Sequence, residues 1–141
     1  MPSSTFTFVD QFKEDLLKEV HDFENDTFIV ALVASANAPD TSDAVLADLT
    51  EIAYTNLSSR TLTGVSGEQT SGTAPLLMDD LVLTASGGSV AAFRYIVIYN
   101  DTSTSPADPL VGFWDYGTDL TLADGQSLTI DVGVNGMGTI S

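Results

Sequence analysis

From residue 75 onward the chain is a succession of short segments rich in β-branched and aromatic residues, separated by turn signals and without helical periodicity. Five segments are predicted to be strands: Leu76–Ala85, Val90–Tyr99, Leu110–Tyr116, Leu120–Ala123 and Ser127–Val134. Neighbouring parallel strands would need a crossover connection, usually a helix, and none is predicted between these segments. The series therefore predicts antiparallel pairing.

Two turn signals and two apolar patterns refine this prediction. Ser86–Ser89 contains two glycines and links the first two segments, and Asp124–Gly125 predicts a two-residue hairpin between the last two. Alternate residues are apolar in Ser127–Val134, so we expect this strand to be buried on one face only. Val90–Tyr99 carries large apolar side chains on both faces and is predicted to be a central strand.

One helix is predicted before the strands, over about residues 8–22. Its apolar stripe recurs every three to four residues, at Phe8, Phe12, Leu16, Val20 and Phe23. Thr7 followed by Asp10 resembles a capping box that would start the helix. We expect the helix to pack on the core, with binding to a partner as the alternative, and we expect His21 to be a capping or surface residue near its end.

The segments between the helix and residue 75 complete the fold prediction. Thr27–Ser35 reads as a strand buried on both faces, Ala44–Tyr54 as a short helical turn leading into an extended segment, and Ser59–Val65 as a further strand before a polar loop. The fold class is therefore mainly β. We predict one domain over residues 1–141: an antiparallel β-sandwich, jelly-roll-like, of about seven to eight strands with one amino-terminal amphipathic helix.

Charge limits the partners that such a domain can have. The chain has 4 basic and 20 acidic residues, and its formal net charge is -16. Proteins that grip nucleic acids or anionic membranes need clustered Lys and Arg, so we expect neither partner here. The charge predicts a self-repelling surface facing solvent, an acidic face docked on a less acidic partner, or adaptation to a salty environment.

Other function classes are limited by residue types that are scarce. The longest strictly apolar run, Phe28–Ala34, is far shorter than the roughly 20 residues of a spanning helix, and the first residues do not resemble a secretory signal. Without cysteine there are no disulfides, thiolate metal sites or cysteine nucleophiles. A single histidine suits neither a zinc site nor, without a Gly-x-Ser-x-Gly pattern, a serine triad. We predict no catalytic residue, no cofactor and no metal.

Carboxylates leave two chemical alternatives open. A carboxylate-based glycoside hydrolase needs two acids in a cleft; the candidates are Asp79, Asp80, Asp115 and Asp131. The alternating acids of Asp22–Asp26 suit calcium, although this stretch lacks the glycine at the sixth position and the later bidentate glutamate of a helix–loop–helix calcium site.

Four residues are candidates for an interface. Arg60 and Arg94 each interrupt a predicted strand, so each is expected to pair with a carboxylate, either within the chain or across a subunit boundary. Trp114 and Tyr116 fall on one face of a predicted strand. We expect most of this aromatic cluster to be core, with anchoring of a partner as the alternative for Trp114.

Several stretches resemble a group of small virion proteins of tailed bacteriophages. They are Phe12–Phe23 with Asp26–Leu32, Val45–Arg60, Leu83–Val90 with Phe93–Asp101, and Pro109–Gly117 with Leu122–Gln126. Together they span nearly the whole chain. The resemblance implies a structural virion component, with head decoration or cement as its role, and it supplies no catalytic residues.

The resemblance and the charge agree on a location. A strongly acidic protein is expected to avoid the inner capsid wall, which faces DNA phosphates, and to sit on the outer surface of the head. The expected partners are the major capsid protein and further copies of the chain itself, with a trimer expected from the local three-fold positions of a shell. The alternative is a tail or fibre component that binds host surface glycans.

Overall fold

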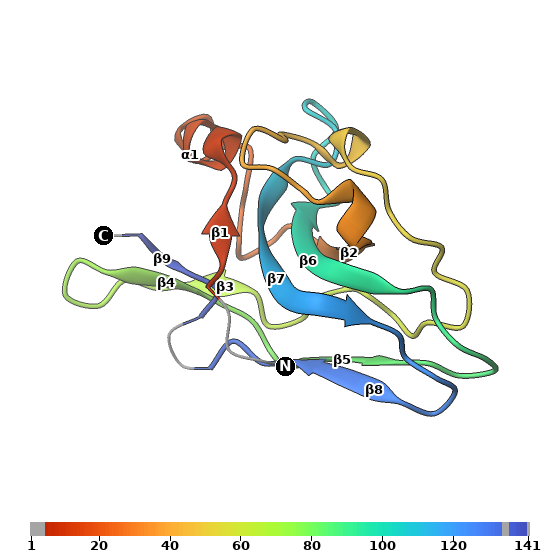
Figure 1. Ribbon diagram of the computed structural model, residues 1–141. Coiled ribbons are helices and arrows are strands. Elements are labelled where there is room, and N and C mark those ends of the chain that lie inside the picture. Colours follow the sequence, from red (N-terminus) through yellow and green to blue (C-terminus); the bar gives the residue numbers. More distant parts are fainter. Residues whose placement is uncertain (1–4, 134–135, 141) are drawn as a thin grey trace.

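The computed structural model describes residues 5–133 and 136–140, and the chain folds into antiparallel β-sheets with one α-helix near the amino terminus (Figure 1). The strands are β1 (Thr7–Phe8), β2 (Phe28–Val33), β3 (Ser66–Gly67), β4 (Ala74–Leu77), β5 (Leu81–Thr84), β6 (Phe93–Asn100), β7 (Leu110–Leu120), β8 (Ser127–Ile130) and β9 (Thr139–Ile140). The helices are α1 (Asp10–Leu17) and two short 3₁₀ helices, η1 (Ser35–Asn37) and η2 (Leu46–Asp48). The predicted class, mainly β and antiparallel with one amino-terminal helix, is confirmed.

The largest sheet has the order β1-β7-β6-β2. Its centre is β6, as predicted, and Ile96 pairs with Trp114 of β7 and with Leu32 of β2. Ile96, Val97 and Ile98 are all fully buried, because one face of β6 meets the core and the other is covered by neighbouring segments. The apolar run of β2 is likewise buried on both faces except at Ile29.

Two smaller sheets complete a sandwich-like arrangement around one core. Their strand orders are β3-β4-β9 and β5-β8, and Figure 1 shows the β5-β8 pair lying beneath the large sheet. Leu76 of β4, Leu83 of β5 and Ile130 of β8 belong to the same apolar cluster as the large sheet. Burial of this shared apolar surface is the main force that holds the sheets together.

The alternation predicted for the last strand is confirmed over β8. Leu128 and Ile130 are buried, whereas Ser127 and Thr129 are exposed. The predicted strand also included Val134, which lies outside the described residues.

The predicted Asp124–Gly125 hairpin is wrong. β7 and β8 belong to different sheets, and β8 pairs with β5 instead. The turn bonds to the segment that follows β5: the Gly125 backbone N–H donates to the Ala85 carbonyl (2.8 Å) and the Gly87 N–H donates to Asp124 Oδ1 (3.0 Å). The glycine-rich turn Ser86–Ser89 also leads from one sheet to another. Both turns therefore mark sheet changes at one end of the sandwich.

The boundaries of several predicted strands are wrong. The segment predicted as one strand, Leu76–Ala85, is divided into β4 and β5, because the Asp79 N–H leaves the ladder and donates to the Thr63 carbonyl (2.9 Å). The strand predicted over Leu110–Tyr116 continues to Leu120 as β7, and its polar Gly117–Asp119 stretch is exposed. The next predicted strand, Leu120–Ala123, is wrong beyond Leu120, because Thr121–Ala123 have no regular structure.

Two extended segments cover the edge of β2 that faces away from β6. The strand predicted over Ser59–Val65 is wrong, because this segment is not a regular strand. It nevertheless bonds to β2: the Val30 N–H donates to the Arg60 carbonyl and the Leu62 N–H to the Phe28 carbonyl, both at 2.9 Å. The short helical turn predicted within Ala44–Tyr54 is confirmed as η2. Covering an edge strand protects its unpaired backbone groups from association with other chains.

The helix is shorter than the predicted 8–22. Thr7 and Phe8 form strand β1 on β7, and the N-cap residue is Val9 with no side-chain cap, so the predicted Thr7 capping box is wrong. After Leu17 the chain turns through Glu19 at φ 59°, and Val20 N–H donates to the Asp15 carbonyl (2.9 Å). This pattern closes a helix in the manner of a Schellman motif. No helix in residues 5–133 and 136–140 is long and apolar enough to cross a membrane.

Because the helix ends at Leu17, His21 lies outside it. The predicted surface position is wrong: His21 lies beyond the helix, is 8% exposed, and packs beside the rings of Phe12, Phe23 and Phe28. A continued helix would have kept this ring on the helix surface. The turn at Glu19 instead directs the following residues toward the core.

Candidate functional site

All four basic side chains of the chain are held by acids of the same chain. Lys13 lies 3.8 Å from Asp10, Lys18 binds Glu14, Arg60 lies 3.8 Å from Glu51, and Arg94 binds Asp115. The net charge of -16 therefore rests on carboxylates without a Lys or Arg partner. Each Lys and Arg side chain therefore lies beside a carboxylate, and the remaining acids leave the surface negative.

Arg60 belongs to a cluster that fixes the covered edge of β2. Its guanidinium stacks on Tyr54, 3.6 Å from the ring centroid, and Nη1 donates to the Val30 carbonyl (2.5 Å). The Tyr54 hydroxyl donates to Glu51 Oε1 (2.6 Å) and accepts from the Leu32 N–H (2.9 Å). Burial and the Glu51 carboxylate raise the pKa of Tyr54 well above its ordinary value. The arginine thus ties a loop to the sheet within one chain.

Arg94 makes a bidentate pair on the large sheet. Its Nε and Nη2 donate to the two carboxylate oxygens of Asp115 at 2.8 and 3.0 Å. The bond from Arg94, together with the Gly117 N–H, holds the pKa of Asp115 below its ordinary value. The intrachain alternative predicted for both arginines is the arrangement that the structure contains.

The two aromatic interface candidates occupy different environments. Trp114 is 4% exposed and its ring lies 4.7 Å from that of Phe6, so it is a core residue and not an exposed anchor. Tyr116 is half-buried and packs against the core. Trp114 therefore packs in the core as expected, in contact with the Phe6 ring.

The candidate acids for hydrolysis are divided. Asp80 lies beside Asp131, and partial desolvation with the carboxylates of Asp131 and Asp79 raises its pKa above the ordinary value. Asp79, Asp80 and Asp131 are all exposed. Asp115 is bound to Arg94 elsewhere. Three of the four candidate acids therefore lie together on an exposed surface, and Asp115 is separate from them.

The structure contains a groove with a volume of about 660 Å³. We call it the acidic groove; its lining is Leu16, Glu19, His21, Asp22, Phe23, Glu24, Ser66, Gly67, Glu68, Ala74, Leu76 and Ile140. The lining comes from the end of α1 and the turn after it, from β3 and the residue beyond, from β4, and from β9. Segments at both ends of the sequence thus meet around it.

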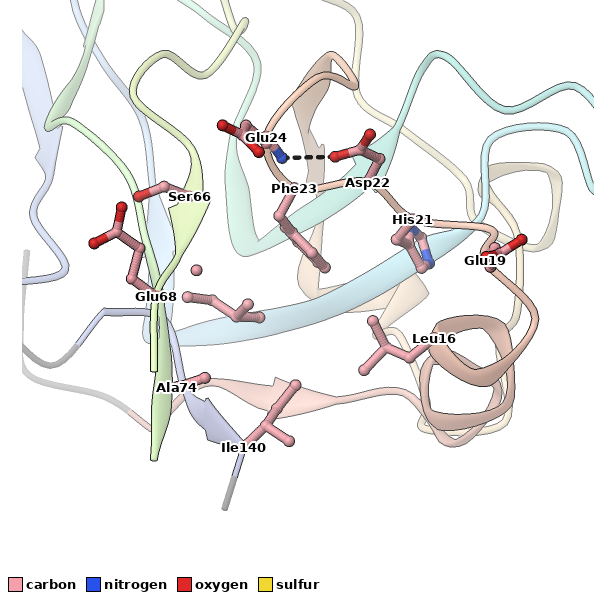
Figure 2. A pocket seen from close by; sticks show the side chains of 12 residues that line it. Leu16, Glu19, His21, Asp22, Phe23, Glu24, Ser66, Glu68, Ala74 and Ile140 are labelled. Atoms are coloured by element: carbon pink, nitrogen blue, oxygen red, sulfur yellow. Dashed lines mark hydrogen bonds between the residues drawn. The ribbon is translucent and has the colours of Figure 1, made fainter. Parts of the chain in front are cut away.

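The groove combines an apolar floor with a charged rim. In Figure 2, Phe23, Leu16 and Ile140 lie around its middle, Glu24 and Glu68 at one end and Glu19 toward the other. Ile140 is 41% exposed and Leu17, next to the lining residue Leu16, is 87% exposed. Glu19, Asp22, Glu24 and Glu68 are exposed. The described lining holds no Lys or Arg.

Asp22 gives the rim a fixed loop. Its Oδ1 accepts from the Glu24 N–H (3.0 Å, dashed in Figure 2) and the Asn25 N–H (3.2 Å), and Oδ2 accepts from Asn25 Nδ2 (2.8 Å). The Asp22 N–H in turn donates to Asp26 Oδ2 (2.9 Å). The Asn25 side chain and the Glu24 N–H lower the pKa of Asp22, so this rim charge is retained in mild acid. The acids considered for calcium thus bind their own loop, and no set of three His or acidic groups placed to hold a metal occurs among the described residues.

A buried polar pair lies at one side of the groove. His21 Nδ1 is 3.3 Å from Asn100 Nδ2, which donates also to Asp26 Oδ2 (2.7 Å). His21 Nε2 faces Asp15 Oδ2 at 3.9 Å, and both atoms are buried without a hydrogen-bond partner in the described part of the chain. Burial lowers the pKa of His21, and the nearby Asp15 and Asp26 carboxylates partly oppose this effect. The ring is thereby kept neutral in the folded protein at pH 7.

Sequence reasoning did not find this groove. The acids near residue 22 have a regular spacing, but Glu68 and Ile140 carry no local pattern that links them to the helix. Their proximity depends on β4 pairing with both β3 and β9. Leu17, which the helical periodicity assigns to the apolar stripe, is instead 87% exposed beside the groove.

No protein-family model, curated protein or solved structure matches this chain. Observations on which a function can be proposed therefore come from the fold, the charge and the groove.

Proposed function

We propose that this chain is a non-enzymatic structural protein that decorates the outer surface of a tailed-phage head and acts through protein–protein contacts. Its partners in this proposal are the major capsid protein and further copies of itself, with a trimer as the assembly. The sequence resemblance described above suggests the setting, and the distribution of charge supports the mode of action.

The observation that carries the proposal is that every Lys and Arg side chain is paired with an acid. Lys13, Lys18, Arg60 and Arg94 are each paired with an acid of the same chain. Phosphate binding needs clustered cations, whereas each of these four lies beside a carboxylate that opposes an approaching phosphate. An acidic surface of this kind suits the outside of a DNA-filled shell and a partner with complementary positive charge.

The packing of the chain supports a role that requires persistence. The sheets share one apolar cluster. The edge of β2 that faces away from β6 is covered by extended segments that hydrogen-bond to it. A protein that reinforces a shell against internal pressure needs a stable body and a specific contact surface. The fold supplies the first, and the acidic groove is a concave surface suited to the second.

The proposal is tested by co-sedimentation of the purified protein with empty heads of the tailed phage that encodes it. Light scattering first establishes the mass of the free protein. The expected result is a discrete oligomer that binds heads saturably, in a copy number matching the symmetry of the shell. A monomer that leaves heads unoccupied at all concentrations would contradict the proposal.

The tail or fibre alternative makes a different prediction in the same experiments. Binding to host surface glycans would favour flat, exposed aromatic rings, whereas Trp114 is buried and Tyr95 meets Phe113 edge to face at 6.5 Å. Binding to isolated glycans without binding to heads would favour this alternative.

A further inference from the structure

We propose that the acidic groove is the docking site for a basic, partly apolar segment of the partner protein. The segment would place an apolar side chain on the floor and Lys or Arg side chains against the rim. This inference rests on the proposed function for the identity of the partner, but its chemistry follows from the groove itself.

The first argument is that the floor of the groove is apolar but exposed to water. Leu16, Phe23 and Ile140 offer apolar surface in a hollow of about 660 Å³, and Ile140 is 41% exposed. Cavities of this size are typical of sites that enclose a ligand or a few side chains. Covering this surface with an apolar side chain removes it from water, which favours association.

The second argument is charge complementarity. Glu19, Asp22, Glu24 and Glu68 surround the floor, and the described lining contains no basic group. Every Lys and Arg of the chain is already paired elsewhere. These rim charges therefore have no Lys or Arg partner within the chain, and a segment with Lys or Arg is the partner they would select.

The same charges decide against another copy of this chain as the occupant. A second copy also carries a net charge of -16, and each of its Lys and Arg side chains already lies beside an acid. Its approach would place like charges across a contact, which costs free energy and slows association. The self-association expected for the proposed oligomer must therefore use another surface.

The third argument is that the groove is fixed before binding. Asp22 bonds three groups of its own loop, and the helix end at Glu19 is closed by the bond from Val20 to Asp15. Beneath the turn, Phe23 stacks on buried Phe28 with centroids 4.7 Å apart. A site held in this way loses less conformational entropy on binding.

The test uses two synthetic peptides of equal charge, acetyl-Lys-Leu-Lys-Ile-Lys-amide and acetyl-Lys-Ser-Lys-Ser-Lys-amide, in fluorescence anisotropy titrations. Two double variants lower the charge equally: Glu24→Gln with Glu68→Gln in the groove, and Asp80→Asn with Asp101→Asn elsewhere. None of these four side chains takes part in a salt bridge in the described structure. Unfolding midpoints of all variants are compared first, to establish that each is folded.

We expect the apolar basic peptide to bind the wild type more tightly than the serine peptide. The groove double variant should bind it about fivefold more weakly, the size expected for two partly exposed ion pairs, whereas the control double variant should bind nearly as the wild type does. Equal losses in the two double variants would mean that the peptide senses only net charge, and would overturn the inference.

The floor is tested by a second matched pair. Ile140→Ser removes exposed apolar surface in the groove, and Val82→Ser removes it from β5, where Val82 is 49% exposed. Only Ile140→Ser is expected to reduce the preference for the leucine–isoleucine peptide. Identical affinities of the two peptides for the wild type would also overturn the inference.

Head binding separates this inference from the proposed function. If the wild type binds heads and the groove variants bind them equally well, the groove inference fails and the proposed function stands. If the wild type does not bind heads, the proposed function fails, and the peptide titrations alone decide whether the groove accepts a basic apolar segment.

Discussion

Acidification is expected to destabilise the folded protein in part through His21. Its ring is buried, and burial lowers its pKa below the ordinary value of 6.5, against the opposing effect of the Asp15 and Asp26 carboxylates. The folded state therefore binds a proton more weakly than the unfolded state does. Stability from this group is fully present above pH 6.5 and is lost as the pH falls from 6.5 toward the lowered pKa.

The size of the loss has an upper bound, because a single proton is involved. Between pH 7.5 and 5.5, an unfolded histidine with a pKa near 6.5 that gains a proton, while the folded one gains none, changes the free energy of unfolding by about 1.4 kcal/mol. Partial protonation of folded His21 reduces this value. The expected loss is therefore a measurable fraction of about 1.4 kcal/mol.

The assay is urea unfolding at a series of pH values, with His21→Gln as the reference. Glutamine does not titrate, and its carbonyl can accept from Asn100 Nδ2 as the His21 ring does. Since the carboxylates titrate in both proteins, the difference between their free energies of unfolding isolates the histidine. This difference should fall with acidification.

A difference that rises as the pH falls would refute the reasoning. It would mean that attraction between protonated His21 and Asp15, whose Nε2 and Oδ2 atoms are 3.9 Å apart, outweighs the cost of burying the charge. A nuclear magnetic resonance titration of the single histidine gives its folded pKa directly and must agree in sign.

Two further predictions concern the core and the attachment of β1. Phe28→Ala removes a ring that is 1% exposed and should lower the free energy of unfolding by about 3–5 kcal/mol in urea titrations; a loss below about 1 kcal/mol would show that the site is not packed as described. Gly112→Ala would place a Cβ 2.3 Å from the Thr7 carbonyl oxygen and should cost about 1–3 kcal/mol, with faster amide exchange in β1. Gly67→Ala, whose Cβ would meet no atom closer than 3.7 Å, is the control, and equal losses in both glycine variants would contradict the steric explanation.

The acidic groove links the pH prediction to the proposed contact. His21 contributes to the lining, while Asp22 keeps its charge in mild acid because the Asn25 side chain and the Glu24 N–H lower its pKa. Weakening of the fold near His21 would therefore loosen the turn that carries the rim before the rim loses this charge.

The strand content and its central element were predictable from local patterns. Large apolar side chains on both faces of Val90–Tyr99 indicated a strand with neighbours on both sides, and β6 has them. The alternation that starts at Ser127 gave the buried face of β8. These predictions depend only on which side chains prefer to leave water, a property that each residue carries with it.

Helix length and strand pairing were not predictable in the same way. The apolar stripe continued to Phe23, but the chain leaves the helix after Leu17 because burying His21 against Phe12 and Phe28 requires the turn at Glu19. Asp124–Gly125 has the residues of a hairpin, yet the following strand pairs with β5. A turn signal specifies a change of direction, and the partner strand is chosen by contacts distant in sequence.

The antiparallel β class, the helix near the amino terminus and the excess of negative charge follow from the type and order of the residues. Tertiary structure alone decided that all four cations are paired within the chain, that Trp114 is enclosed, and that Glu68 and Ile140 meet the turn after α1. Local preferences fix what each segment can become. Which segments share a core, and therefore which charges surround a groove, depends on burying apolar surface from the whole chain at once.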